Sequence, residues 1–82
     1  MTRESLRETI LSALAEIAPE ADLQSLDPMA DMRLELDLDS MDILRLATAL
    51  HDKLSVEIPE GDYAKIASLQ GCIDYLQKRA MS

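Results

Sequence analysis

One hydroxyl group, that of Ser40, lies among three carboxylates in the segment LDLDSMDILRL, residues 36 to 46. The carboxylates belong to Asp37, Asp39 and Asp42. A serine in such surroundings has four possible roles: a residue of a helix start, a catalytic nucleophile, a member of a metal site, or the acceptor of a covalently attached group. Each role makes a different demand on the rest of the chain.

A nucleophilic serine needs an adjacent base, and the sequence offers none close to Ser40. The only histidine, His51, follows eleven residues later on what the sequence predicts to be the same helix, roughly 16 Å away at a rise of about 1.5 Å per residue. The nearest lysine in sequence, Lys53, is farther still. We therefore do not expect the chain to be an enzyme that uses Ser40 as its nucleophile.

A metal site is equally poorly supported. The pattern D-x-D-S-x-D, counted from Asp37, is similar to the start of a calcium loop, which needs an oxygen ligand at its fifth position, glycine at its sixth and glutamate at its twelfth. The chain has Met41, Asp42 and Thr48 there. Cys72 is the single cysteine, so neither a thiolate metal site nor an internal disulfide is expected, and a reducing cytoplasm fits best.

Covalent attachment fits the chemistry of a helix start. A phosphate ester on Ser40 would meet unpaired N–H groups and the positive end of the helix dipole. The flanking carboxylates partly oppose an anion here, but they would give a modifying enzyme a charged feature to recognise. The residues alone leave two readings of Ser40 open, an ordinary first-turn residue or an attachment point.

Composition restricts both the fold and the partners. The 82 residues predict a single domain over residues 1–82, with a small core. Apolar residues make up 48% of the chain, but only Tyr63 and Tyr75 are aromatic. The core must therefore be aliphatic, which favours helices. Charged residues interrupt the first apolar positions, so neither a signal peptide nor a membrane span is expected.

Negative charge is concentrated in residues 19–42. This stretch holds eight carboxylates against one arginine, a net charge of −7 out of −8 for the whole chain. Such a field disfavours nucleic acid and anionic membranes as partners and favours proteins with a basic surface.

The first predicted helix begins with a capping box of Ser5 and Glu8 and ends before Pro19. Its core stripe, at helical spacing, consists of Leu6, Ile10, Ala13, Leu14 and Ile17. Residues 19–38 contain two prolines, much acid and no sustained period. We predict a long loop of about twenty residues there, a length typical of functional segments.

The second predicted helix begins at Asp39 as N-cap, and Asp42 at the third helical position completes a capping box. Its core face consists of Ile43, Ala47, Leu50 and Leu54, with Leu46 at the edge. Residues 55–59 are predicted to be extended because Pro59 disfavours helix before it.

A short helix is predicted over residues 60–66, and Ser68 is predicted to cap a last helix. The core stripe of that helix consists of Leu69, Cys72, Ile73, Leu76 and Ala80. The predicted fold is all-α, a small four-helix bundle of three longer helices and one short one, with the long loop between the first and second.

Four segments at a particular spacing make the chain similar to the acyl carrier proteins. They are DSMD at residues 39–42, VEIP at 56–59, KIASLQ at 65–70 and IDYL at 73–76. The resemblance implies that Ser40 carries 4′-phosphopantetheine, transferred from coenzyme A by a phosphopantetheinyl transferase that supplies the base and the magnesium ion. It also implies a monomeric carrier, not an enzyme, whose thiol holds acyl groups as thioesters for fatty-acid, polyketide or specialised lipid synthesis.

The same resemblance implies partner-recognition roles for Asp39, Met41, Asp42 and Arg45. Arg45 departs from the family, whose corresponding helix is more uniformly acidic, and its i,i+3 spacing predicts an ion pair with Asp42. Two interpretations stay open: a salt-bridged, solvated helix face, or a docking surface for partner enzymes of mixed charge. Asp37 also departs, since the family usually has glycine three residues before the serine. Aspartate tolerates a left-handed backbone better than most residues, so the turn is expected to survive.

The resemblance further implies an acyl pocket, predicted from Leu46, Ala47, Leu50, Ile58, Tyr63, Ile66, Cys72 and Ile73. Tyr63 and Cys72 stand where the family often has smaller side chains, so we expect a shallow pocket suited to short or polar cargo. An aminoacyl or peptidyl carrier, and a helical interaction module that is never modified, remain the alternative functions.

Overall fold

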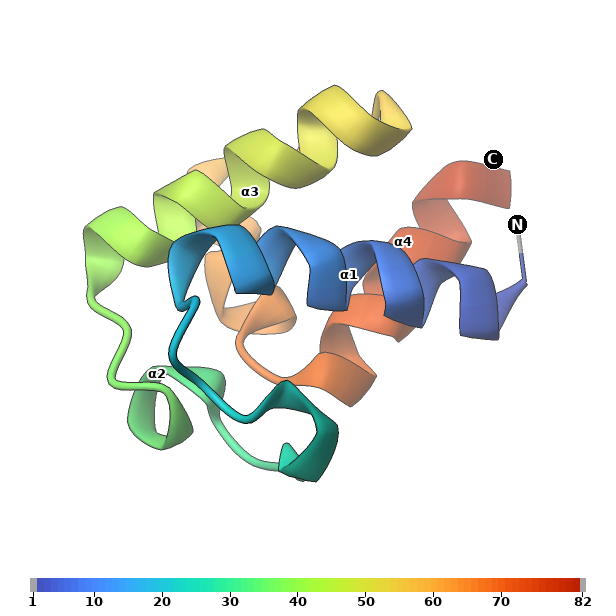
Figure 1. Cartoon of the computed structure of the whole chain (residues 1–82). Helices are drawn as coiled ribbons and strands as arrows, with labels where there is room; N and C mark the ends of the chain where they lie inside the picture. Colours follow the sequence, from blue (N-terminus) through green and yellow to red (C-terminus); the bar gives the residue numbers. More distant parts are fainter. Residues whose placement is uncertain (1, 82) are drawn as a thin grey trace.

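The computed structural model describes residues 2–81, and the side chains of residues 2–79. The described residues form helices and connecting segments without strands, as the sequence predicts. In chain order the elements are α1 (Arg3–Ile17), η1 (Leu23–Ser25), α2 (Met32–Glu35), α3 (Ser40–Leu54), η2 (Glu60–Ile66) and α4 (Leu69–Met81). Helix α1 packs against both α3 and α4, and the 3-10 helix η2 packs against α3 and α4 (Figure 1).

Helix α1 begins earlier than predicted. Its N-cap is Thr2, whose hydroxyl accepts a hydrogen bond from the Ser5 N–H at 3.0 Å. The predicted capping box of Ser5 with Glu8 is therefore wrong, because Ser5 already has a helical place in the first turn. Leu11, outside the predicted stripe, is buried, whereas Ile17 is only half-buried.

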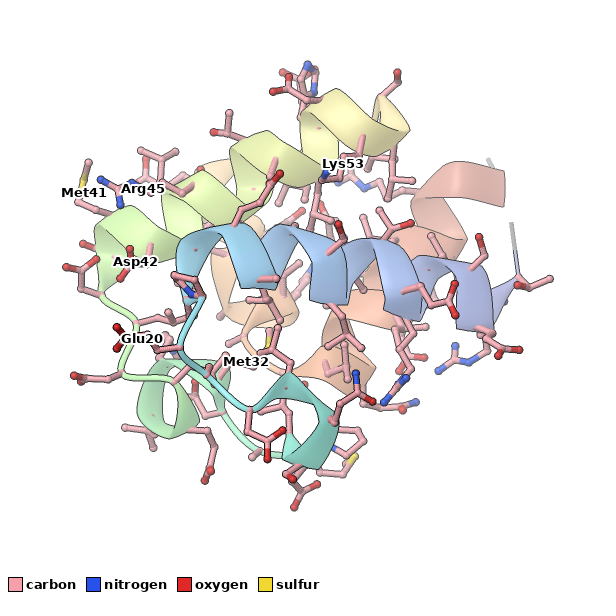
Figure 2. The ribbon with its side chains drawn as sticks, viewed as in Figure 1. Glu20, Met32, Met41, Asp42, Arg45 and Lys53 are labelled. Atoms are coloured by element: carbon pink, nitrogen blue, oxygen red, sulfur yellow. The ribbon has the colours of Figure 1, made fainter. Side chains whose placement is uncertain are left out.

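The predicted long connection over residues 19–38 is present, but it is more ordered than its sequence indicates. This segment contains η1 and α2, and it buries Leu26, Met32 and Leu38. The side chain of Met32 points from α2 into the molecule (Figure 2), and its backbone N–H donates to the Ala67 carbonyl at 2.7 Å. Leu26, Met32 and Leu38 each fix a different part of the segment to the core. The segment is therefore ordered by tertiary contacts, although its apolar residues follow no regular spacing.

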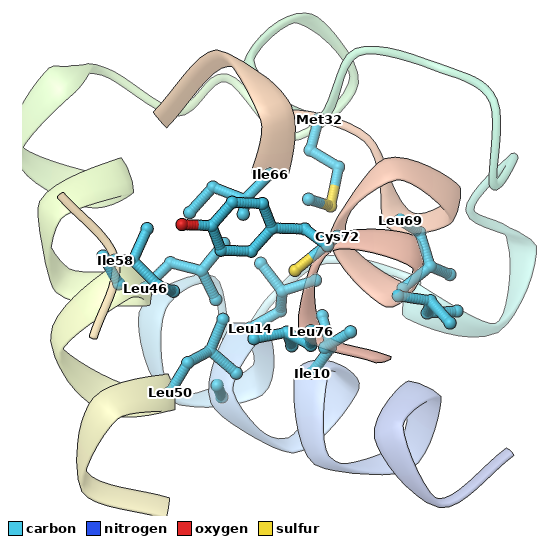
Figure 3. Packing of buried hydrophobic residues seen from close by; sticks show 14 of the residues in the cluster. Ile10, Leu14, Met32, Leu46, Leu50, Ile58, Ile66, Leu69, Cys72 and Leu76 are labelled. Atoms are coloured by element: carbon cyan, nitrogen blue, oxygen red, sulfur yellow. The ribbon is translucent and has the colours of Figure 1, made fainter. Parts of the chain in front are cut away.

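The core lies between α1, α3 and α4, with η2 closing one side. Figure 3 shows side chains from all of these elements converging there, among them Ile10, Leu14, Leu46, Leu50, Ile66, Cys72 and Leu76. Leu46 is fully buried, not at an edge, while Leu54 is half-buried. The reason is that α1 and η2 cover α3 from two sides, which widens its buried face.

Helix α4 begins as predicted, since the Ser68 hydroxyl accepts a hydrogen bond from the Gly71 N–H at 3.0 Å. Its buried stripe contains the predicted Leu69, Cys72, Ile73 and Leu76, and also Tyr75. The predicted core position of Ala80 lies outside the described side chains. Within residues 2–81, no helix has the length and apolar character needed to cross a membrane.

Candidate functional site

Ser40 is the first residue of α3 and is exposed. Its hydroxyl makes no hydrogen bond with any of the residues that the structure describes. The first N–H groups of a helix also lack partners within the helix. An anionic ester at this position would therefore meet free donors, and nothing covers the oxygen that would form the bond.

The backbone around Ser40 is fixed by the predicted capping box. The Asp42 N–H donates to Oδ1 of Asp39 at 2.9 Å, and the Asp39 N–H donates to Oδ2 of Asp42 at 3.3 Å. Asp39 itself is extended, as an N-cap residue should be. Two residues flanking Ser40 thus bond to each other, which leaves the serine side chain free while its backbone is held.

Asp37 takes a left-handed backbone conformation with φ of 55°. Glycine adopts this conformation more readily than other residues do, and here an aspartate adopts it, so the turn is kept. The following N–H, that of Leu38, donates to the Arg33 carbonyl at 3.0 Å, and the Leu38 side chain is buried. The turn at Asp37 between α2 and α3 therefore lets Leu38 point inward and places Asp39 at the N-cap position of α3.

The outer face at the start of α3 combines apolar and charged groups. Met41 is 57% exposed and Leu44 is 42% exposed, and Figure 2 shows Met41 and Arg45 projecting from this end of the helix. Nη1 of Arg45 lies 3.6 Å from Oδ1 of Asp42, the predicted pair, which is worth a few tenths of a kcal/mol at an exposed position. Sequence reasoning missed Leu44, although its place outside the buried stripe was a signal.

A hollow of about 680 Å³ lies beside this helix start, between the end of α1 and the η1–α2 segment. Five carboxylates line it, those of Glu20, Asp22, Glu35, Asp37 and Asp42. Figure 2 labels Glu20 and Asp42, which line this hollow. The sequence located the charge in this stretch but not its convergence, which depends on how the segment folds. In the described part of the chain, no three potential ligands are grouped so as to hold a metal ion.

The predicted pocket residues separate into two groups. Ala47, Ile58 and Tyr63 line a surface hollow of about 190 Å³, together with Thr48, His51 and Glu57, which sequence reasoning missed. The other predicted members are packed in the core behind it: Leu46, Leu50, Ile66, Cys72 and Ile73.

The thiol of Cys72 is enclosed in the core. The side chain has no exposed surface, and burial raises the pKa of the thiol to about 12. Since the thiolate is the reactive form, Cys72 acts as a small core residue at neutral pH.

The chain is similar to known proteins of one family. Residues 8–76 match the family model described as a phosphopantetheine attachment site. The acyl carrier protein of Campylobacter concisus is 38% identical over 60 residues, covering 66% of this chain and 77% of that protein. The acyl carrier protein of Rubrobacter xylanophilus is 32% identical over 73 residues, covering 85% and 90%. That of Thermobifida fusca is 35% identical over 72 residues, covering 84% and 91%.

The chain belongs to the acyl carrier protein family. Phosphopantetheine is the prosthetic group of this family, and its members are carriers, not catalysts. Such carriers work with the enzymes that modify them and with enzymes that process their acyl groups.

Proposed function

We propose that Ser40 is the attachment residue and that the chain carries acyl groups between enzymes of fatty-acid, polyketide or specialised lipid synthesis. The group attached to Ser40 would be 4′-phosphopantetheine, whose terminal thiol holds the acyl chain as a thioester. The observation that carries the proposal is the exposed, unbonded hydroxyl of Ser40 at the first position of α3, between the paired residues Asp39 and Asp42.

Each neighbouring residue has a distinct part in this proposal. Asp39 and Asp42 hold the backbone on either side of Ser40, so that a transferase meets one conformation of the acceptor. The first-turn N–H groups and the helix dipole favour the phosphodiester once it is formed. His51 lies on the same helix, eleven residues away, which is why the proton of the Ser40 hydroxyl must pass to a base of the transferase.

Mass spectrometry of the intact protein tests the attachment. The chain is incubated with coenzyme A and a phosphopantetheinyl transferase of broad specificity, and one phosphopantetheine mass is expected to be added. Ser40→Ala should gain nothing, whereas Ser12→Ala, which removes another exposed hydroxyl, should react like the wild type. No gain on the wild type, or an equal gain on Ser40→Ala, would leave the unmodified interaction module as the better reading.

We also propose that Asp39, Met41, Asp42 and Arg45 form the surface that partner enzymes recognise. Arg45 is 67% exposed at its side chain and lies next to the exposed Met41, so a partner would need an acidic group facing it as well as basic groups facing the aspartates. The surface is thus mixed in charge, which supports a dedicated partner over a general one.

Charge reversal tests the role of Arg45. With the cognate partner, Arg45→Glu should lower kcat/KM and change its salt dependence, because a favourable contact becomes repulsive. Lys78→Glu, at an exposed position of α4 with no ion pair to another described residue, is the matched control and should have little effect. Unchanged or improved turnover with Arg45→Glu would remove Arg45 from the recognition surface.

We further propose that the chain works as a single carrier domain, as a monomer in the cytoplasm. The family match over residues 8–76 supports the single domain. The buried free thiol of Cys72 suits a reducing compartment.

A further inference from the structure

The exposed large apolar side chains of the described residues all lie in one stretch of the chain. They belong to Met29, Leu34, Met41 and Leu44. Single exposed apolar residues are common on protein surfaces, but these fall together within residues 29–44, a stretch that includes Ser40. Exposed apolar side chains gathered around one position indicate an interaction surface.

Leu34 is the most exposed of them, at 81%, and it stands on a firmly held turn. The Asp31 carboxylate caps α2 by accepting a hydrogen bond from the Arg33 N–H at 2.9 Å, and the Leu34 N–H donates to the Asp31 carbonyl at 3.0 Å. The buried Met32 fixes the turn to the core, where its N–H donates to the Ala67 carbonyl. A side chain presented on a fixed backbone loses little freedom when a partner buries it.

Leu34 lies close to Ser40, although the two are six positions apart in the sequence. The Leu38 N–H donates to the Arg33 carbonyl at 3.0 Å, and that carbonyl belongs to the peptide bond that precedes Leu34. With standard backbone dimensions on either side of this hydrogen bond, the Cα atoms of Leu34 and Ser40 lie at most about 15 Å apart. Figure 1 shows α2 and the start of α3 at the same end of the molecule.

An enzyme that modifies Ser40 must cover this area. Within the described part of the chain, the Ser40 hydroxyl has no hydrogen-bonded base, so a phosphopantetheinyl transferase has to bring its own base within about 3 Å of that oxygen. A standard interface buries about 800 Å² on each partner, the area of a disc about 16 Å in radius. Such an interface centred on Ser40 reaches Leu34. Enzymes that act later on the terminal thiol need not lie over Ser40, because the serine oxygen no longer reacts.

The charges around Leu34 indicate what kind of surface fits it. Arg33 is neutralised by Asp31, since Nη2 of the guanidinium lies 2.8 Å from Oδ2 of the carboxylate. The carboxylates of Glu35 and Asp37 line the acidic hollow beside the start of α3. A complementary surface therefore combines an apolar recess for Leu34 with basic groups around it.

Resting on the proposed attachment at Ser40, we propose that Leu34 is a docking residue for the phosphopantetheinyl transferase, which contacts α2 as well as α3. Leu34 enters an apolar recess of the enzyme, while Met41 contacts the enzyme from the first turn of α3. Leu34 touches no reacting atom, so it contributes to binding of the chain and not to the chemical step.

Transfer kinetics test the inference. The rate of phosphopantetheine transfer from saturating coenzyme A by the broad-specificity transferase is measured over a range of concentrations of the apo chain. Leu34→Gln keeps the length of the side chain but not its apolar end, and it should raise KM about tenfold, because burial of a leucine is worth at least that much in affinity. The kcat should stay within about twofold of the wild type. Leu34→Met, which remains apolar, should behave like the wild type.

Met29→Gln is the matched control, because it makes the same kind of change at a residue that is 75% exposed. The preceding residue, Pro28, accepts a hydrogen bond from the Gln70 N–H at 2.9 Å. Met29 therefore lies beside the start of α4, away from the start of α3 (Figure 1), and its replacement should leave KM unchanged. Circular dichroism establishes that each variant is folded, and Leu34→Ala replaces Leu34→Gln if that variant is not.

Three kinetic results would overturn the inference: a KM for Leu34→Gln within about twofold of the wild type, an equal rise for Met29→Gln, or a loss confined to kcat. Size-exclusion chromatography gives a fourth, a wild-type dimer that Leu34→Gln converts to a monomer, which would assign Leu34 to a contact between two copies of the chain. A wild type that gains no phosphopantetheine refutes the proposed attachment and this inference with it. Any of the four results with a modified wild type refutes only the role of Leu34.

Discussion

Replacing Asp39 by alanine removes the acceptor that fixes the start of α3. In the wild type, Oδ1 of Asp39 accepts from the Asp42 N–H at 2.9 Å, and the return bond from the Asp39 N–H to Asp42 is 3.3 Å long. Loss of an N-cap of this kind destabilises a protein by about 1 kcal/mol. The longer return bond, no longer held in place, adds about 0.5 kcal/mol at most.

Interaction of the Asp39 charge with the helix dipole adds little to this figure. It favours the wild type by up to about 1 kcal/mol, but the nearby carboxylates of Asp37 and Asp42 repel the same charge. We therefore expect Asp39→Ala to lower the free energy of unfolding by about 1.5 kcal/mol in urea titrations. The corresponding fall in Tm is about 6–12 °C for a domain of this size.

The matched variant is Asp39→Asn, which keeps the acceptor and removes the charge. It should stay within about 0.5 kcal/mol of the wild type, since asparagine caps helices about as well as aspartate. Asp39→Ala combined with Asp42→Ala should be less destabilising than the two single losses added, because both remove the same box. If the asparagine variant loses as much stability as the alanine variant, the capping argument is refuted in favour of a charge effect.

Four further perturbations follow from individual contacts. Ser55 has a left-handed φ of 56°, which costs most residues about 1–2 kcal/mol, so Ser55→Gly should raise the free energy of unfolding by about 0.5 kcal/mol after the entropy of glycine is allowed for; a loss of stability in urea would contradict this. A Cβ added at Gly71 would lie 2.8 Å from the Lys65 carbonyl oxygen, so Gly71→Ala should cost about 1–3 kcal/mol, and a urea midpoint equal to that of the wild type would show that the contact relaxes freely. Burial raises the pKa of the Cys72 thiol to about 12, so a disulfide reagent at about pH 8 should label Cys72 only after denaturation; rapid labelling of the native chain would mean that the core opens. The hydrogen bond from the Tyr75 hydroxyl is the main reason that the pKa of Asp62 lies below its usual range. The contribution of Asp62 to the free energy of unfolding is therefore present above the unfolded pKa of about 3.9 and is lost as the pH falls through the folded pKa. Asp62→Asn should reduce stability at neutral pH more than in acid, and equal losses in urea at both pH values would disprove the linkage.

Local signals made the start of α3 predictable. An N-cap residue, its partner three positions later and a helical apolar period all act within a few residues, so Asp39, Asp42 and the start at Ser40 follow from the sequence. Ser68 and the short helix over residues 60–66 were predictable for the same reason. The cap of α1 was misassigned because Ser5 satisfies the same local pattern as Thr2, and only packing of the first turn selects between them.

Residues 19–38 show where local signals fail. The backbone N–H of Met32 donates to the Ala67 carbonyl, far along the chain, and this contact holds the buried Met32 in place. The spacing of apolar residues in the sequence does not predict such a contact. The full burial of Leu46 likewise depends on η2 covering α3 from a second side.

The sequence by itself determined the class of protein, the all-α fold and the residue proposed for attachment, because capping patterns, helical periods and family motifs are short-range features of the chain. Only the tertiary structure decided what surrounds that residue. It gathered Glu20 and Asp22 beside Asp42, and it linked Asp62 to Tyr75 and Arg79. Such contacts join residues far apart in sequence, and their geometry is set by how the helices pack, which no local pattern encodes.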